Sequence, residues 1–225
     1  MQKGFINVNP NTLKKAELVQ YLTGTCTHGH KYVEHPACFV REMEKELKIG
    51  YLDIEATGLE ADYHHILSYV IKTRDKKEYY QGIITQEELL KLQFDKRVCK
   101  KLLKDMLRYD VLITFYGTGY DIPFIRARCL KWGLEFAQFG MVKHKDLYYM
   151  SRRLLKLHRK SLEVAANFLG IKGKDHVLGD VWMAARVGDA KALKYVLSHN
   201  ITDAEITEKL HKKLEAYDKG LIKSI

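Results

Sequence analysis

The stretch Gly50-Tyr51-Leu52-Asp53-Ile54-Glu55-Ala56-Thr57-Gly58-Leu59 decides which fold to expect from this chain of 225 residues. It places two carboxylates two residues apart at the end of a short apolar run. Side chains repeat every second residue on one face of a β-strand, so Asp53 and Glu55 point the same way. Like charges that share a face repel each other, and a cation between them removes that cost. The Thr-Gly pair that follows lets the chain leave the strand sharply.

The Asp-x-Glu pattern alone leaves two interpretations open. A solvated strand end with two surface acids would give the same letters. Hard cations such as Mg²⁺ bind carboxylate oxygens, usually from one or two side chains together with substrate phosphates. Whether the strand end is a metal site therefore depends on further acids elsewhere in the chain.

A third acid, Asp121, follows the apolar run 111–116, which fits a buried strand. One interpretation makes Asp121 the N-cap of the next helix, with Pro123 in its first turn. The other places Asp121 at a strand end, level with Asp53 and Glu55.

A fourth acid, Asp203, lies four residues after His199, so the two share a face if the segment is helical. A nuclease would need both: a carboxylate for a metal and an imidazole that titrates near neutral pH to activate water. The competing interpretation is an ordinary helix start capped by Asn200 or Thr202.

The order Asp53-x-Glu55, Gly-x-x-Tyr-Asp121 and His199-x-x-x-Asp203 resembles the DEDD exonucleases of the RNase H-like superfamily. The resemblance covers about residues 48–215 and is closest to a subgroup of predicted RNase H-like nucleases found in bacteria and their phages. It rests also on the segments 114–124 and 145–149. It implies an α/β fold with a central mixed five-stranded sheet, strand order 3-2-1-4-5, strand 2 antiparallel, and flanking helices.

The resemblance also implies roles for individual residues. The four metal-binding acids correspond to Asp53, Glu55, Asp121 and Asp203, which would hold two Mg²⁺ or Mn²⁺ ions. His199 stands in the place of the catalytic base. Family members with a histidine base usually place it five residues before the last aspartate, and that position here is Ser198. The four-residue spacing belongs to members with tyrosine.

Three further residues are assigned to substrate binding by the same resemblance. Thr57 and Gly58 follow the first motif, and Tyr116 stands where many relatives carry asparagine. The tyrosine is expected either to stack on a base or to pack inside the protein. Asp146, a fifth acid near the same sheet edge, is expected to support the site or the fold.

Residues 1–47 are predicted to form an extension to the nuclease domain of residues 48–225. Five metal-binding side chains lie between positions 26 and 38 of the extension. Structural zinc uses four thiolate or imidazole ligands. The predicted set is Cys26, His30, His35 and Cys38, with His28 as the alternative, and a histidine-rich surface loop is the competing interpretation. Two more cysteines, at positions 99 and 129, are expected to pack as small apolar side chains.

The formal charge of +10 favours an anionic partner such as nucleic acid. No run approaches the ~20 apolar residues of a membrane span, and the first residues lack the apolar core of a signal peptide. We therefore expect a cytoplasmic protein without a membrane partner.

The function expected from the sequence is a metal-dependent 3′–5′ exonuclease acting on a single-stranded end of DNA or RNA. The alternatives are a non-catalytic nucleic-acid-binding module and a nuclease subunit of a larger complex, with the extension as the docking element for a protein partner. A hydrolase of small nucleotides is a third alternative.

Hydrophobic periodicity predicts where the secondary structure lies. Strands are expected over 49–56, 65–73, 78–85, 111–116 and 142–147. Helices are expected over 13–22, 39–47, 95–108, 148–157, 161–169 and 180–187, with one more after Asp121. Two separate helices, 190–197 and 200–217, are expected to end the domain.

Overall fold

The computed structural model describes residues 13, 15–26, 28–138, 140–173, 176–218 and 223–224. The described residues form two compact units, one ending at Leu47 and the other running from Lys48 to Asp218 with the strand Lys223–Ser224. The first unit holds α1 (Lys15–Thr23) and α2 (Pro36–Glu46).

The larger unit is built on one mixed sheet with β1 at its centre. β1 pairs antiparallel with β2 and parallel with β4, which pairs parallel with β5. The order β3-β2-β1-β4-β5-β6 confirms the predicted five-strand order, with strand 2 antiparallel, and a two-residue strand extends the edge beside β5. The strands are β1 (Ile49–Ala56), β2 (Ile66–Thr73), β3 (Tyr79–Ile83), β4 (Val111–Thr114), β5 (Lys143–Asp146) and β6 (Lys223–Ser224).

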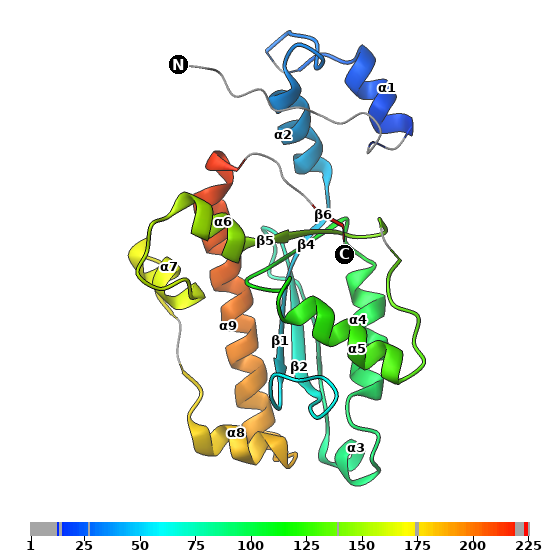
Figure 1. The fold of residues 1–225 in the computed structure, drawn as a ribbon, viewed down its shortest axis with the longest axis vertical. Coiled ribbons are helices and arrows are strands. Elements are labelled where there is room, and N and C mark those ends of the chain that lie inside the picture. The colour runs from blue at the N-terminus through cyan, green and yellow to red at the C-terminus, as the bar shows by residue number, and fades with distance from the viewer. Residues whose placement is uncertain are drawn as a thin grey trace. The chain divides into compact units, whose positions relative to one another are not determined.

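Helices cover both faces of this sheet (Figure 1). The long helix α9 packs on one face, with α8 alongside it, and α4 packs on the other face next to α5. The helices are α3 (Gln86–Leu90), α4 (Lys96–Met106), α5 (Asp121–Lys131), α6 (Leu147–Leu154), α7 (Leu162–Phe168), α8 (Gly179–Arg186) and α9 (Ala190–Leu214). Among the described helices, none is both long and apolar enough to cross a membrane.

The alternation of β1 sends its residues to two different layers. Leu52 and Ile54 join the apolar cluster formed with α4 and α5. Tyr51 points to the opposite face, where its hydroxyl meets Nδ1 of His211 in α9 at 3.0 Å. Asp53 shares the face of Tyr51, so the period-2 pattern directs the carboxylates of β1 toward α9. Two cysteines, Cys99 and Cys129, are fully buried in the opposite layer, as predicted.

The prediction of two separate helices at the end of the domain is wrong. A single 25-residue helix, α9, runs from Ala190 to Leu214. The polar run Ser198-His199-Asn200 resembles a helix boundary in sequence, but the backbone continues through it. The hydroxyl of Thr202 donates to the carbonyl of Ser198, four residues earlier, so Thr202 is an interior helical residue and no cap.

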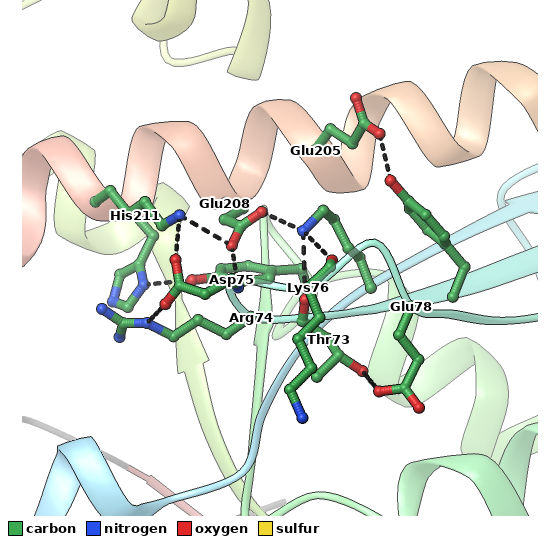
Figure 2. Close-up of polar contacts among 12 residues, drawn as sticks. Thr73, Arg74, Asp75, Lys76, Glu78, Glu205, Glu208 and His211 are labelled. Atoms are coloured by element: carbon green, nitrogen blue, oxygen red, sulfur yellow. Dashed lines mark hydrogen bonds and ion pairs between the residues drawn. The ribbon is translucent and has the colours of Figure 1, made fainter.

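The C-terminal half of α9 is fixed to the β2–β3 hairpin by buried charge (Figure 2). Lys72 of β2 forms an ion pair with Glu208, and both side chains are under one-tenth exposed. The backbone N–H of Asp75 donates to the same carboxylate at 2.7 Å, and Arg74 pairs with Glu215 at 2.9 Å. These contacts fix the register of α9 against the sheet, which also sets the position of its other half, where His199 and Asp203 lie.

Two buried histidines make the domain sensitive to acid. Burial lowers the pKa of His144 to about 4 and that of His211 to about 3. Between these values and the ordinary 6.5 the unfolded chain binds more protons than the folded chain, so stability falls as pH decreases. Each histidine is expected to lower the free energy of unfolding by up to ~2 kcal/mol between pH 6.5 and pH 5.

Urea unfolding at a series of pH values measures this loss. His211→Gln is expected to reduce the slope of the stability profile between pH 6.5 and pH 5, with the share of His144 remaining. His158→Gln, which changes an exposed histidine, is expected to leave the profile unchanged. A wild-type profile that is already flat in this window would contradict the expectation.

Candidate active site

The acidic residues of the sequence motifs meet at one edge of the sheet. Asp53 and Glu55 lie at the end of β1, and Asp121 is the first residue of α5, after β4. Because β1 and β4 run parallel, their carboxyl ends lie at the same edge. α9, which packs on β1 and β2, supplies Asn200 and, one turn later, Asp203.

Asp121 is buried, with 4% of its surface exposed. The interpretation of Asp121 as a helix N-cap is wrong, because the N-cap is Tyr120 and Asp121 already belongs to the helix. Its Oδ1 instead accepts a hydrogen bond from the backbone N–H of Ile54 in β1, at 3.2 Å. Burial raises the pKa of Asp121 to about 7, an effect that the Ile54 N–H opposes. A cation beside this carboxylate would restore its ionised form.

Asn200 is a residue of the site that the sequence motifs do not predict. This residue is fully buried, and its Nδ2 donates to Oδ2 of Asp53 at 2.5 Å. The only signal in the sequence was its neighbour His199, because the two residues of the contact lie 147 positions apart. The amide fixes the orientation of the Asp53 carboxylate.

The remaining acids gather around His199. Its Nε2 lies 3.9 Å from Oε1 of Glu55 and 3.7 Å from Oδ2 of Asp203. One ligand atom from each of these three residues lies within 4.8 Å of the others. The side chains of all three are less than one-fifth exposed, so their charges are weakly screened by water.

The donor set fits a hard divalent cation. Asp53, Glu55 and Asp121 line one cleft, and Glu55 also groups with Asp203. Oxygen ligands of this kind are those that Mg²⁺ and Mn²⁺ prefer. The negative potential also affects Tyr120: burial raises the pKa of its phenol first, and the charges of Asp121, Glu55 and Asp53 raise it further. The residues that would hold metal are Asp53, Glu55, Asp121 and Asp203.

A cleft of about 430 Å³ opens beside the acids. Asp53, Glu55 and Asp121 form one part of its lining, and Tyr116 with Leu59 forms another. Both of the latter side chains are exposed, Tyr116 by 45% and Leu59 by 73%. The cleft therefore joins a charged floor to an accessible aromatic and aliphatic rim.

The loop that carries Tyr116 is held by Asp146. The carboxylate of Asp146 accepts backbone N–H groups of Tyr116, Thr118 and Tyr148 at 2.8–2.9 Å. Tyr116 has a φ of 68°, a left-handed conformation that is costly for a bulky residue. Its ring lies over Gly119, where an added Cβ would come within 2.6 Å of the ring. Asp146 thus maintains a strained loop that positions an exposed aromatic side chain.

Thr57 and Gly58 shape the turn that follows the acids. The hydroxyl of Thr57 accepts the N–H of His65 at 3.1 Å, and the carbonyl of Gly58 accepts the hydroxyl of Tyr120 at 3.0 Å. A Cβ on Gly58 would meet the ring of His64 at 2.4 Å, so any larger residue here would have to displace that ring. Both residues therefore tie the β1–β2 connection to the edge of the cleft.

The predicted zinc ligands lie in the other unit. Ligand atoms of Cys26, His35 and Cys38 come within 4.8 Å of one another. The nearest further imidazole is that of His28, the alternative fourth ligand, whereas His30 stacks on His35.

Comparison with known proteins assigns the larger unit to a family. A family model described as RNase_H superfamily matches residues 50–215. The chain belongs to the RNase H superfamily. The match spans β1 from its second residue, β2 to β5 and the whole of α9, so the site lies inside the family's own domain.

Relatives of this RNase H-like domain include archaeal DNA polymerases. The DNA polymerase of Methanocaldococcus jannaschii is 30% identical over 142 residues, which is 52% of this chain and 8% of the polymerase. That of Thermococcus kodakarensis is 29% identical over 155 residues, 60% of this chain and 9% of the polymerase. The chain thus corresponds to less than a tenth of these proteins.

A solved structure has the same fold. The family B DNA polymerase of Pyrobaculum calidifontis superimposes with a TM-score of 0.61 over 76% of this chain and 25% of the polymerase, at 17% identity. The arrangement of sheet and helices in the RNase H-like domain is therefore shared with one part of that enzyme.

Loss of the Asn200 amide is expected to weaken metal binding to this RNase H-like domain. In Asn200→Ala, the carboxylate of Asp53 loses the hydrogen bond that orients it, and affinity for Mn²⁺ is expected to fall about 10–100-fold. Isothermal titration with Mn²⁺ measures the change. Asn167→Ala, in α7, is the control, and equal affinities of wild type and Asn200→Ala would contradict the expectation.

Proposed function

We propose that this chain is a metal-dependent nuclease that hydrolyses phosphodiester bonds in DNA or RNA, as a 3′–5′ exonuclease similar to the predicted nucleases of bacteria and phages. The proposal is carried by one observation: Asp53, Glu55 and Asp121 line one cleft in a domain of the RNase H superfamily, and Glu55 also lies within 4.8 Å of a ligand atom of Asp203. Buried acids that face one another are costly without a cation, so their convergence favours a catalytic site over a non-catalytic module.

Each residue of the site has a chemical task in this proposal. When bound, two divalent cations would supply Lewis-acid stabilisation of the scissile phosphate and a more acidic water. His199, next to Glu55 and Asp203, is placed to accept the proton of the attacking water. Asn200 orients the carboxylate of Asp53, and the Ile54 N–H orients that of Asp121.

The substrate in this proposal is a single-stranded end. Tyr116 offers a ring at the rim of the cleft, and bases of any sequence can stack on an exposed aromatic face. The Thr57–Gly58 turn borders the path of the strand. The net charge of +10 favours a polymer over a small nucleotide.

The test is an incubation with 5′-labelled single-stranded DNA and RNA in Mg²⁺, Mn²⁺ or EDTA. A metal-dependent ladder that starts at the 3′ end is the expected result. Internal cuts would retain a metal-dependent nuclease and reject the exonuclease assignment. Binding without cleavage in every metal would reject the nuclease and leave a nucleic-acid-binding module.

Removal of the Tyr116 ring is expected to weaken substrate binding more than cleavage of bound substrate. Stacking of one base on an aromatic side chain contributes about 1–3 kcal/mol, so Tyr116→Ala is expected to raise KM about 5–100-fold with a smaller change in kcat. Tyr116→Phe keeps the ring and should behave like wild type. An equal loss of activity in both variants would indicate that the hydroxyl, and not stacking, matters.

A further inference from the structure

We propose that Cys26, His28, His35 and Cys38 form a structural zinc site that holds the N-terminal unit together. This site lies outside the nuclease cleft and does not depend on the proposed nuclease activity. Two thiolates and two imidazoles are a common ligand set for tetrahedral zinc.

The spacing of the ligand atoms supports the proposal. Zn–S bonds of 2.3 Å and Zn–N bonds of about 2.05 Å place a sulfur and a nitrogen of one tetrahedral site about 3.6 Å apart. The Nδ1 atom of His28 lies 3.8 Å from Sγ of Cys26 and 3.5 Å from Sγ of Cys38. The Nδ1 atom of His35 lies 3.9 Å from Sγ of Cys38. These three of the six ligand–ligand distances lie within 0.3 Å of the tetrahedral value.

The structure also distinguishes between the histidines. His30, which the sequence favoured as a ligand, stacks on the ring of His35 with centroids 4.2 Å apart and an interplanar angle of 26°. Neither His28 nor His30 belongs to the group of ligand atoms within 4.8 Å that Cys26, His35 and Cys38 form, but the Nδ1 atom of His28 lies within 3.8 Å of both sulfurs. The stacked ring supports the orientation of His35, and His28 supplies the fourth ligand.

The backbone around the ligands has the form of a tight loop followed by a helix. The N–H of Gly29 donates to the carbonyl of Cys26, and the N–H of Cys26 donates to the carbonyl of His30, both at 2.8 Å. Gly29 has a φ of 81°, which lets the loop reverse. Pro36 begins α2 and places Cys38 in its first turn. The loop and the helix therefore each present a cysteine and a neighbouring histidine to the same point.

The small core of this unit explains why it needs a metal. Among its described residues, the buried apolar cluster consists of Tyr21, Cys26, Tyr32 and Phe39. A core of this size rarely stabilises a fold without a disulfide or a metal. Cys26 belongs both to this cluster and to the ligand set, with 4% of its surface exposed. Four protein ligands leave no open position, so the site is structural rather than catalytic.

The experiment measures zinc in the full-length chain after dialysis against Mg²⁺ buffer. Mass spectrometry of the metal is expected to give about one zinc ion per chain, and Co²⁺ substitution to give the visible absorption of a tetrahedral site with thiolate ligands. His28→Gln and Cys38→Ser are expected to lower zinc affinity at least about 100-fold. His30→Gln, the matched control, is expected to change it less than about threefold.

Three results would overturn the proposal. Zinc that stays bound in a Cys26→Ser/Cys38→Ser variant would belong to another site. Loss of zinc in His30→Gln with retention in His28→Gln would replace the ligand set. A wild-type chain that contains no zinc, and in which Cys26 and Cys38 form a disulfide, would show that a disulfide and not a metal joins the loop to α2.

Limited proteolysis checks the folding of the N-terminal unit. Removal of zinc is expected to speed cleavage within residues 15–47 and to leave the larger unit intact.

Discussion

Asp121→Asn is expected to abolish metal-dependent cleavage, by about 10³-fold or more, and at the same time to stabilise the metal-free domain. The asparagine keeps an oxygen for the N–H of Ile54 and removes a buried negative charge. Because burial raises the pKa of Asp121 from 3.8 to about 7, the folded chain binds more protons than the unfolded chain in that range, and stability falls as pH rises through it.

At pH 8 the full cost of the ionised carboxylate is present, and it amounts to about 4 kcal/mol. In EDTA at this pH, Asp121→Asn is therefore expected to melt about 8–16 °C above wild type. Addition of Mn²⁺ should stabilise wild type and leave the variant almost unchanged. Thermal denaturation with and without Mn²⁺ measures both effects.

The control for this prediction is Asp62→Asn, which changes an exposed acid on the β1–β2 connection. It is expected to alter neither activity nor melting temperature. Two results would contradict the assignment of Asp121 as a buried metal ligand. One is a melting temperature of Asp121→Asn below that of wild type in EDTA, and the other is retention of a tenth of the wild-type activity.

Asp95→Ala is expected to destabilise the domain by about 3–5 kcal/mol, the largest stability effect that we expect from one substitution. Asp95 is fully buried and pairs with Arg128, which is 2% exposed. The guanidinium donates twice, at 2.7 and 2.8 Å, and the indole of Trp132 and the N–H of Ile66 donate to the same carboxylate. Burial acts to raise the pKa of Asp95, but these donors outweigh it and lower the pKa.

The large cost arises because the variant leaves a buried cation without its anion. Replacement of both partners, in Asp95→Ala/Arg128→Met, removes the unpaired charge and is expected to recover a large part of the loss. Glu87→Ala breaks the exposed pair with Lys91 and is expected to cost less than about 1 kcal/mol. Urea unfolding at pH 7 compares the three variants. A double variant less stable than Asp95→Ala alone would show that the pair contributes net stability.

Local sequence patterns predict the strands near the site because strand formation there depends on residues that are close together in the chain. Alternation in 49–56 placed Asp53 and Glu55 on one strand face, and the structure has β1 over these residues. The apolar run before Asp121 marked β4. The strand order came from the family resemblance and not from periodicity, since periodicity carries no information about which strands are neighbours.

The same local patterns failed where a residue's partner is distant in sequence. The polar run 198–200 in α9 has the pattern of a helix boundary, because hydrophobic periodicity does not show that its side chains contact β1. Asn200 reaches Asp53 across 147 positions, and Arg128 reaches Asp95 across 33. In the N-terminal unit, spacing alone could not choose between His28 and His30, because the choice depends on which ring the loop turns toward the cysteines.

Strand alternation and helix period act within a few residues, so local sequence specifies most of the elements, the acids at the strand end and the class of chemistry that they suit. Tertiary structure decided which side chains complete the two candidate metal centres and which buried charges find a partner. A carboxylate, a thiolate or an imidazole can bind a metal only where other ligands lie within a few ångströms of it. Packing of α9 brings such ligands together in the larger unit, and the N-terminal loop does so in the other.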